Sequence, residues 1–457
     1  MTGISEDLKP RRRLRWWHIV VFGLALCILV LIAIRFKDRT SLEKRLDAIR
    51  AAGYPVTFAE LDAWYEDVPY GENAADYVLD AIACLRKPQR EQERQIPWMG
   101  NAEKPARTQA LAAELVGTVD ELLEKNQEAI GLLERAGALR RSRYPIDLTK
   151  GHATLLPHLS DLRGTVRLLC LKAILHAERG EPESATEALV SAFGVANSEA
   201  TSPVLISQMV RQGGQSVAIS ALERVVNRTT LDEEQLVRLR QTLAEAYDPN
   251  AIARGFVGER CMVIQALRDP RSTGLGFAPV IAQEGPSLLQ LRAAQAVGLV
   301  DRLLVRYIDH VDRALAAMRL PPTERLDVIA ELESDHLDMA EEHPTLTYFM
   351  PTLGRIMRND LAHMTKLRVA ALALAVERYR LANGKLPEQL ADMLPELLET
   401  IPLDPYDGKP LRYGRLDPGF VVYSIGKDRT DDGGKERPAR RRGQEEPNYD
   451  ITFIIER

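Results

Sequence analysis

An uncharged apolar segment near the amino terminus constrains the fold more than any other part of the chain. Residues 16–34 contain no Asp, Glu, Lys or Arg and are almost wholly apolar. A helix of this length is about long enough to cross the hydrocarbon core of a bilayer. Trp16 and Trp17 begin the segment, where interfacial aromatic residues are typical, and basic residues flank both ends. The segment therefore predicts a transmembrane helix rather than a buried helix of a soluble domain.

The charges around this segment favour one orientation. Residues 1–15 form a basic segment with three consecutive arginines, Arg11 to Arg13. Because arginine and lysine concentrate on the cytoplasmic side, we expect a cytoplasmic amino terminus. No small-residue cleavage site follows, so residues 16–35 are interpreted as an uncleaved signal anchor. The rest of the chain would then lie outside the cytoplasm, attached by a single pass to the inner (cytoplasmic) membrane.

Composition limits the remaining possibilities. The chain has 457 residues, which predicts two or more domains, and 45% apolar with 27% charged residues is typical of a globular protein. The net charge is −5 and basic residues are dispersed, so we expect no nucleic-acid partner. The four cysteines show neither zinc-type spacing nor a disulfide framework.

Residues 36–345 are predicted to be a helical domain without a sheet of its own, because apolar residues recur at three- and four-residue intervals. Small residues within 154–197 resemble one tetratricopeptide-type helical hairpin, whereas a solenoid needs about three or more repeats. We therefore expect a helical bundle or a repeat-like array. The longest predicted helices are 108–139, 154–179, 182–197, 207–226, 232–247 and 287–318.

Residues 346–457 are predicted to form a small α+β module. A long helix should end at Asn383-Gly384, and a short helix is expected over 388–399. Strands are expected over 411–413, 419–424 and 450–455, which gives a short antiparallel sheet. An Asp-Gly turn at 406–409 precedes the first strand, and the Asp417-Pro418-Gly419 turn separates the first two.

Several motifs in this module occur together in one known family. The chain reads ERYRLANGKLP, DPYDGKPLRY, FVVYSIGKD and DDGG, followed by a closing strand that begins with Asp-Ile. The combination resembles the C-terminal globular domain of the major pseudopilin of type II secretion systems. The resemblance implies a calcium ion held by the loop after the second strand, and the matching residues are Asp428, Asp431, Asp432 and Asp450. Calcium prefers several oxygen ligands, which aspartate-rich loops with glycine supply.

An alternative without a metal stays open for this loop. A basic insert that contains Arg440, Arg441 and Arg442 separates Asp432 from Asp450. These arginines could fold back and neutralise the carboxylates themselves. In that case the loop would be a solvated acidic surface, and calcium would have no effect on stability.

The sequence contains no nucleophile motif and no phosphate-binding loop, so we expect a protein that is not an enzyme. The leading hypothesis is a membrane-anchored structural or interaction protein of the cell envelope, with secretion or pilus components as protein partners. The first alternative is a tetratricopeptide-like helical scaffold unrelated to secretion. The second is an envelope hydrolase that carries no recognisable motif.

Overall fold

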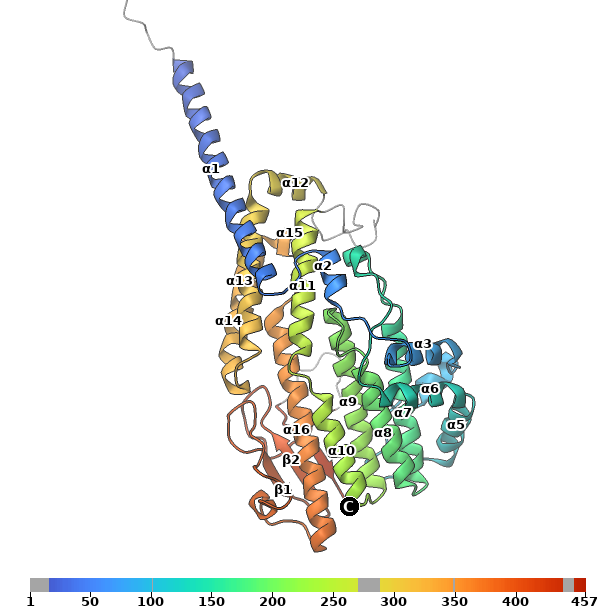
Figure 1. Ribbon diagram of the computed structural model, residues 1–457. Helices are drawn as coiled ribbons and strands as arrows, with labels where there is room; N and C mark the ends of the chain where they lie inside the picture. The colour runs from blue at the N-terminus through green and yellow to red at the C-terminus, as the bar shows by residue number, and fades with distance from the viewer. Residues whose placement is uncertain (1–15, 101, 270–287, 348–349, 439–447) are drawn as a thin grey trace, which may run out of the picture.

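The computed structural model describes residues 16–100, 102–269, 288–347, 350–438 and 448–457. It is mainly helical, with one three-stranded sheet among these residues (Figure 1). The prediction of a mainly α fold with a small antiparallel sheet is therefore confirmed.

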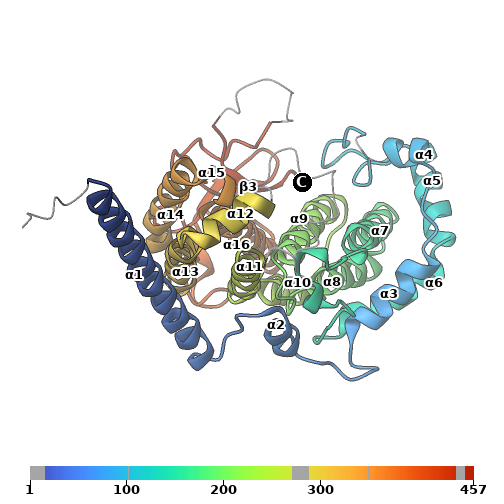
Figure 2. The ribbon, with the colours of Figure 1, turned by 90° about the horizontal axis from the view of Figure 1, so that it is seen from above.

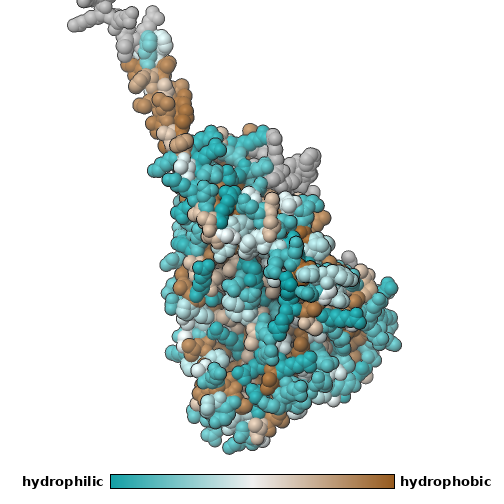
Figure 3. Space-filling view, viewed as in Figure 1, coloured by the Kyte–Doolittle hydropathy of each residue, from teal (hydrophilic) through white to brown (hydrophobic). Residues whose placement is uncertain are grey.

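Helix α1 (Trp16–Ala51) contains the apolar segment and continues into the body of the protein. Its first part projects alone, and Trp16, Phe22 and Leu29 are 77%, 72% and 62% exposed (Figure 3). Its last part is buried through Leu42 and Leu46, which pack beside α13 (Leu299–Ala317) (Figure 2). Among the described residues, α1 is the one helix long and apolar enough to cross a membrane.

The remaining helices before residue 346 form the larger part of the body. They are α2 (Phe58–Trp64), α3 (Ala74–Cys84), α4 (Arg90–Gln95), α5 (Ala113–Glu124), α6 (Gln127–Ala138), α7 (His158–Glu178), α8 (Pro182–Asn197), α9 (Leu205–Arg228), α10 (Glu233–Ala246), α11 (Ala251–Arg268), α12 (Leu288–Ala296), α14 (Pro322–Glu342) and α15 (Pro344–Thr347), with a 3₁₀ helix at Leu148–Ala153. The described part of this region contains no strand and only one isolated bridge, between Asn73 and Arg141, as predicted.

Two predicted long helices are each divided in two. The segment 108–139 becomes α5 and α6 because the buried side chain of Asn126 turns to bond the backbone N–H and C=O of Arg86 at 2.7 and 3.0 Å. The segment 287–318 becomes α12 and α13 because Gly298 adopts a left-handed conformation, with φ at 75°. Both breaks depend on single residues that do not interrupt the apolar periodicity.

The predicted helical hairpin corresponds to α7 and α8, which turn at Gly180 with φ at 70°. Helix α8 also approaches α6 closely, since a Cβ atom added at Gly194 would lie 2.1 Å from the carbonyl oxygen of Gly137. Helix α9 packs against both α7 and α8, and α10 packs against α8 (Figure 1). The hairpin is thus enclosed within a larger bundle.

The carboxyl-terminal part consists of α16 (Leu353–Asn383) and an antiparallel sheet in the order β1-β2-β3. The strands are β1 (Arg412–Arg415), β2 (Phe420–Ser424) and β3 (Ile451–Ile455). The predicted helix over 388–399 is wrong, because only a short 3₁₀ helix forms, at Leu390–Met393. Pro395 explains the difference, since its ring restricts the preceding residue and it cannot donate a backbone hydrogen bond.

One apolar core crosses the boundary expected near residue 346. It includes Leu189 of α8, Val225 of α9, Leu374 of α16 and Phe453 of β3. The last strand is also bonded directly to α9. The side chain of Asn227 donates to the carbonyl of Ile454 and accepts from the N–H of Glu456, each at 2.8 Å. The closing strand is therefore a structural partner of the bundle.

This attachment predicts that Asn227→Ala destabilises the whole protein. The change removes both hydrogen bonds between Asn227 and the end of the chain and leaves the carbonyl of Ile454 and the N–H of Glu456 without these partners, which costs about 2 kcal/mol. Chemical denaturation of the full chain in detergent measures the effect. Asn383→Ala is the matched control, since Asn383 bonds only within its own helix, to the carbonyl of Tyr379. Equal stability of the two variants would contradict the prediction.

Candidate functional site

The C-terminal loops are organised around the carboxylate of Asp404, which is fully buried. It accepts hydrogen bonds from the Tyr406 N–H at 3.0 Å, the Ser424 hydroxyl at 2.9 Å and the Ile425 N–H at 3.0 Å. A guanidinium nitrogen of Arg412 lies 2.6 Å away and balances the charge. The residues of the DPYDG and YSI motifs thus meet at one buried carboxylate.

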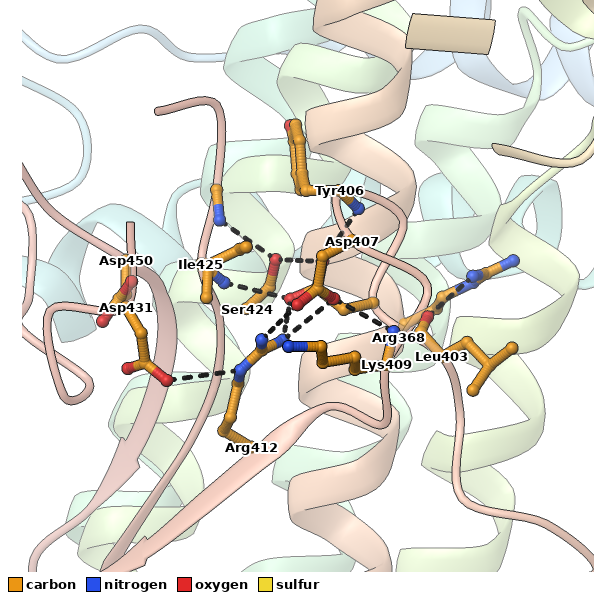
Figure 4. A network of polar contacts seen from close by, with 12 residues as sticks. Arg368, Leu403, Tyr406, Asp407, Lys409, Arg412, Ser424, Ile425, Asp431 and Asp450 are labelled. Carbon is orange, nitrogen blue, oxygen red and sulfur yellow. Dashed lines mark hydrogen bonds and ion pairs between the residues drawn. The ribbon is translucent and has the colours of Figure 1, made fainter. Parts of the chain in front are cut away.

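Arg412 extends this network to the acidic loop. Besides Asp404, it pairs with Asp407 at 2.5 Å and with Asp431 at 3.5 Å (Figure 4). The strand β1 that carries Arg412 therefore holds one of the four predicted metal ligands. Arg412 thus provides a positive charge beside Asp431. In the alternative without a metal, the arginines of the basic insert would have this role. Arg440, Arg441 and Arg442 lie outside the described residues.

Two of the predicted ligands, Asp431 and Asp432, lie near enough to a third, Asp450, for their charges to act on it. Asp450 is 1% exposed and accepts from the Gly434 N–H at 2.7 Å. Burial raises the pKa of Asp450, the N–H groups of Gly434 and Asp432 oppose this rise, and the nearby charges of Asp431 and Asp432 add to it. Asp428 instead accepts from the N–H of Thr430 within its own turn, at 3.2 Å.

Two carboxylate oxygens of this cluster are buried without a hydrogen-bond partner. They are Oδ1 of Asp450 and Oδ2 of Asp432. A buried carboxylate oxygen is costly to leave unpaired, so these atoms fit a hard cation such as calcium. Among the described residues, no group of three or more His, Cys, Asp or Glu side chains is arranged to hold a metal. Backbone carbonyls or water would therefore have to complete the coordination, and calcium accepts such ligands.

A cavity of about 800 Å³ adjoins the acidic loop. Helices α9 and α16 form one side of it, and the chain around Tyr449 and Asp450 forms the other. Glu223 of α9 lines it and accepts from the Ile454 N–H at 2.7 Å. Burial raises the pKa of Glu223 to about 7, although Arg107 and this N–H oppose the rise. We call this cavity the α9–α16 groove.

A buried polar network beneath the groove was missed by the sequence analysis. Gln212 of α9 donates to Asp360 of α16 at 2.7 Å, and Gln215 bonds Nε2 of His363 at 2.6 Å. Arg211 is 1% exposed and donates to Gln208 at 3.0 Å. The three- and four-residue spacing of these polar residues along α9 is the one sequence signal that could have indicated the network. It was not sufficient, because a polar stripe on a helix usually faces solvent.

His363 also lies close to a hydroxyl in the groove. Its Nδ1 atom is 3.5 Å from Oγ of Ser216. Burial lowers the pKa of His363 to about 3, and the charges of Arg211 and Lys366 act in the same direction. A histidine with so low a pKa accepts a proton from serine poorly at neutral pH. The pair therefore fits a structural contact better than a nucleophile with its base.

Comparison with protein-family models, curated proteins and solved structures finds no match to this chain. The geometry of the site is therefore the basis for the assignments that follow.

The unpaired oxygens predict that calcium stabilises the full chain. A ligand present at one hundred times its dissociation constant stabilises the folded state by about 2.7 kcal/mol, so the melting temperature in detergent should rise by several degrees. Magnesium should replace calcium poorly, because it requires near-ideal octahedral geometry. Scanning calorimetry with calcium, magnesium or chelator measures these shifts.

The double variant Asp432→Asn with Asp450→Asn should lose the calcium shift while keeping amide oxygens in place. Asp338→Ala removes an exposed carboxylate of α14 and should keep the shift. Identical melting of the unchanged protein in calcium and in chelator would rule out the calcium site.

Proposed function

We propose that this protein is a membrane-anchored interaction protein of the bacterial cell envelope, with a pseudopilin-like C-terminal region that calcium stabilises. Helix α1 is the observation that carries the proposal. Its apolar half is exposed on all sides, with none of its most apolar stretch buried. A soluble protein rarely exposes an apolar surface of this size, and a bilayer would cover it.

The continuity of α1 supports a fixed attachment to the membrane. The same helix that carries the apolar segment packs its later residues into the core, and Arg45 pairs with Asp309 of α13 at 2.8 Å. Arg302 of α13 lies 3.2 Å from Asp38, closer to the apolar segment. A continuous helix with these contacts would hold the body at a defined angle to the bilayer.

The C-terminal sheet and its loops lie at the end of the body opposite the apolar segment (Figure 1). In this arrangement the sheet would lie far from the membrane. The order of a long helix, a buried Asp404 loop, an antiparallel sheet and a carboxylate-rich loop after β2 supports the resemblance to the pseudopilin domain. Secretion or pilus components are the proposed partners.

Membrane fractionation with reporter fusions tests the anchor and its orientation. A reporter active only outside the cytoplasm, fused after Arg457, should be active, and the full chain should require detergent for extraction. A matched chain with three leucines of the apolar segment, Leu24, Leu26 and Leu29, changed to lysine should lose membrane attachment, because each charge in the bilayer costs about 3 kcal/mol. A fusion active only in the cytoplasm would reverse the orientation.

Co-purification tests the interaction role. The full chain, tagged at its carboxyl terminus and solubilised from membranes, should retain envelope proteins in a constant ratio, as measured by quantitative mass spectrometry. The lysine variant of the apolar segment serves as the control for nonspecific capture. Recovery of the full chain without any enriched envelope protein would contradict an interaction role.

A further inference from the structure

Two lysines of the α9–α16 groove have no carboxylate partner among the described residues. Lys366 of α16 and Lys104 both line it, and neither forms an ion pair with a carboxylate of the described residues. Lys104 donates to the hydroxyl of Ser220 at 3.1 Å. Two of the acids that line the groove are engaged by Arg107, which pairs with Glu223 at 3.4 Å and also with Glu436. The third, Asp450, faces the acidic loop through its bond to the Gly434 N–H. The groove therefore offers positive charge to a ligand.

The surroundings of these lysines favour an incoming anion. Burial lowers the pKa of Lys104, and burial followed by repulsion from Arg437 lowers the pKa of Lys366. Both shifts mean that the protein surroundings disfavour the charged ammonium relative to water. A carboxylate placed against these ammonium groups would reverse this effect. Such a ligand would gain more from them than from a fully solvated lysine.

The groove also exposes part of a strand edge. Strand β3 pairs with β2 on one side, and on the other side its Ile454 N–H is bonded by Glu223 at 2.7 Å. Asp450 on the same side donates its N–H to the carbonyl of Lys435 at 2.9 Å. Because backbone groups alternate along a strand, the N–H and C=O of Thr452 point to this side as well. Thr452 lines the groove, and no described group bonds its outward backbone atoms.

Apolar side chains complete the groove. Met209, Ile219 and Ile356 line it from the two helices, and Met209 is 44% exposed. A volume of about 800 Å³ is enough for several residues of an extended chain. The same cavity thus combines cations, a free strand edge and apolar contacts. Peptides that add to a sheet edge use backbone hydrogen bonds for affinity and side-chain pockets for specificity.

We propose that the α9–α16 groove binds a short extended peptide with acidic side chains, which pairs with the β3 edge at Thr452 and places carboxylates against Lys366 and Lys104. The peptide would belong to a partner protein, so the inference rests on the proposed interaction role and specifies the partner's chemistry. The peptide N–H would donate to the Thr452 carbonyl, and its carbonyl would accept from the Thr452 N–H. A neutral or basic segment would lack the charge complementarity.

Fluorescence anisotropy with the full chain in detergent tests the proposal. The probe is a labelled peptide of alternating glutamate and valine, and its lysine–valine counterpart is the control. The acidic peptide should bind at low salt and weaken as salt rises, since screening reduces charge attraction. Lys366→Gln should weaken binding roughly tenfold, as expected for one lost charge pair. Lys385→Gln, in the exposed turn after α16, should leave binding unchanged.

The strand pairing is tested separately from the charges. Thr452→Pro removes an N–H that β2 does not use, so the sheet should form while peptide affinity falls. A peptide with N-methyl groups on its backbone should also lose affinity for the unchanged protein, which covers the case in which the proline variant does not fold. Full binding of the N-methylated peptide, or equal competition by free succinate, would overturn a strand-pairing site. Equal binding of acidic and basic peptides would overturn the charge assignment.

The membrane and peptide experiments can fail independently. Loss of peptide binding in a chain that fractionates with the membrane would overturn the groove inference alone. Peptide binding by a chain that does not attach to membranes would support the groove and contradict the anchor.

Discussion

The arrangement of the body depends on polar contacts buried between α9 and α16. Gln212 bonds Asp360 and Gln215 bonds His363, and these four side chains are at most 9% exposed. A buried polar group without a partner is costly, so sliding one helix along the other would leave amide and carboxylate groups unpaired. Burial raises the pKa of Asp360 to about 6, against the opposing charges of Arg325 and Arg211. The pairs therefore favour one register of the two helices.

This register determines what the C-terminal region can contact. With α16 fixed on α9, the closing strand lies along α9, where Asn227 and Glu223 bond its outer edge. The same side chains leave Thr452 as the unbonded position of that edge among the described residues. The groove consequently lies where the two helices meet the last strand. Its chemistry comes from four segments that are far apart in the chain, namely α9, α16, the last strand and the stretch that carries Lys104.

The acidic loop depends on a second buried charge. Asp404 and Arg412 form an ion pair within the folded C-terminal loops, and Arg412 also reaches Asp431. Removing one partner of a buried ion pair strongly destabilises the folded protein, because the other charge stays buried without compensation. Asp404 and Arg412 therefore depend on each other. Arg412 offsets the charge of Asp431, whereas Asp450 and Asp432 retain unpaired oxygens. Because Asp431 already has a positive partner and Asp450 does not, we propose that a cation binds beside Asp450 rather than beside Asp431.

Local patterns in the sequence were enough to predict the apolar helix, the helical region without strands, the end of α16 at Gly384 and the three strands. Each of these depends on periodicity or on a turn residue within a few positions. The sequence also directed attention to Asp431, Asp432 and Asp450, whose charges act on one another in the structure. It did not predict the breaks at Asn126 and Gly298, because these depend on a single contact or backbone angle.

Only the tertiary structure decided which faces are covered. The spacing of Gln208, Arg211, Gln212 and Gln215 shows that they share one side of a helix, but spacing does not reveal what lies opposite. The same limit applies to Asp450, which bonds Gly434 and Lys435 of the loop after β2. It also applies to Thr452, whose outward backbone groups no described residue bonds. Periodicity is a property of one segment, whereas burial, charge pairing and an open strand edge are properties of segments brought together.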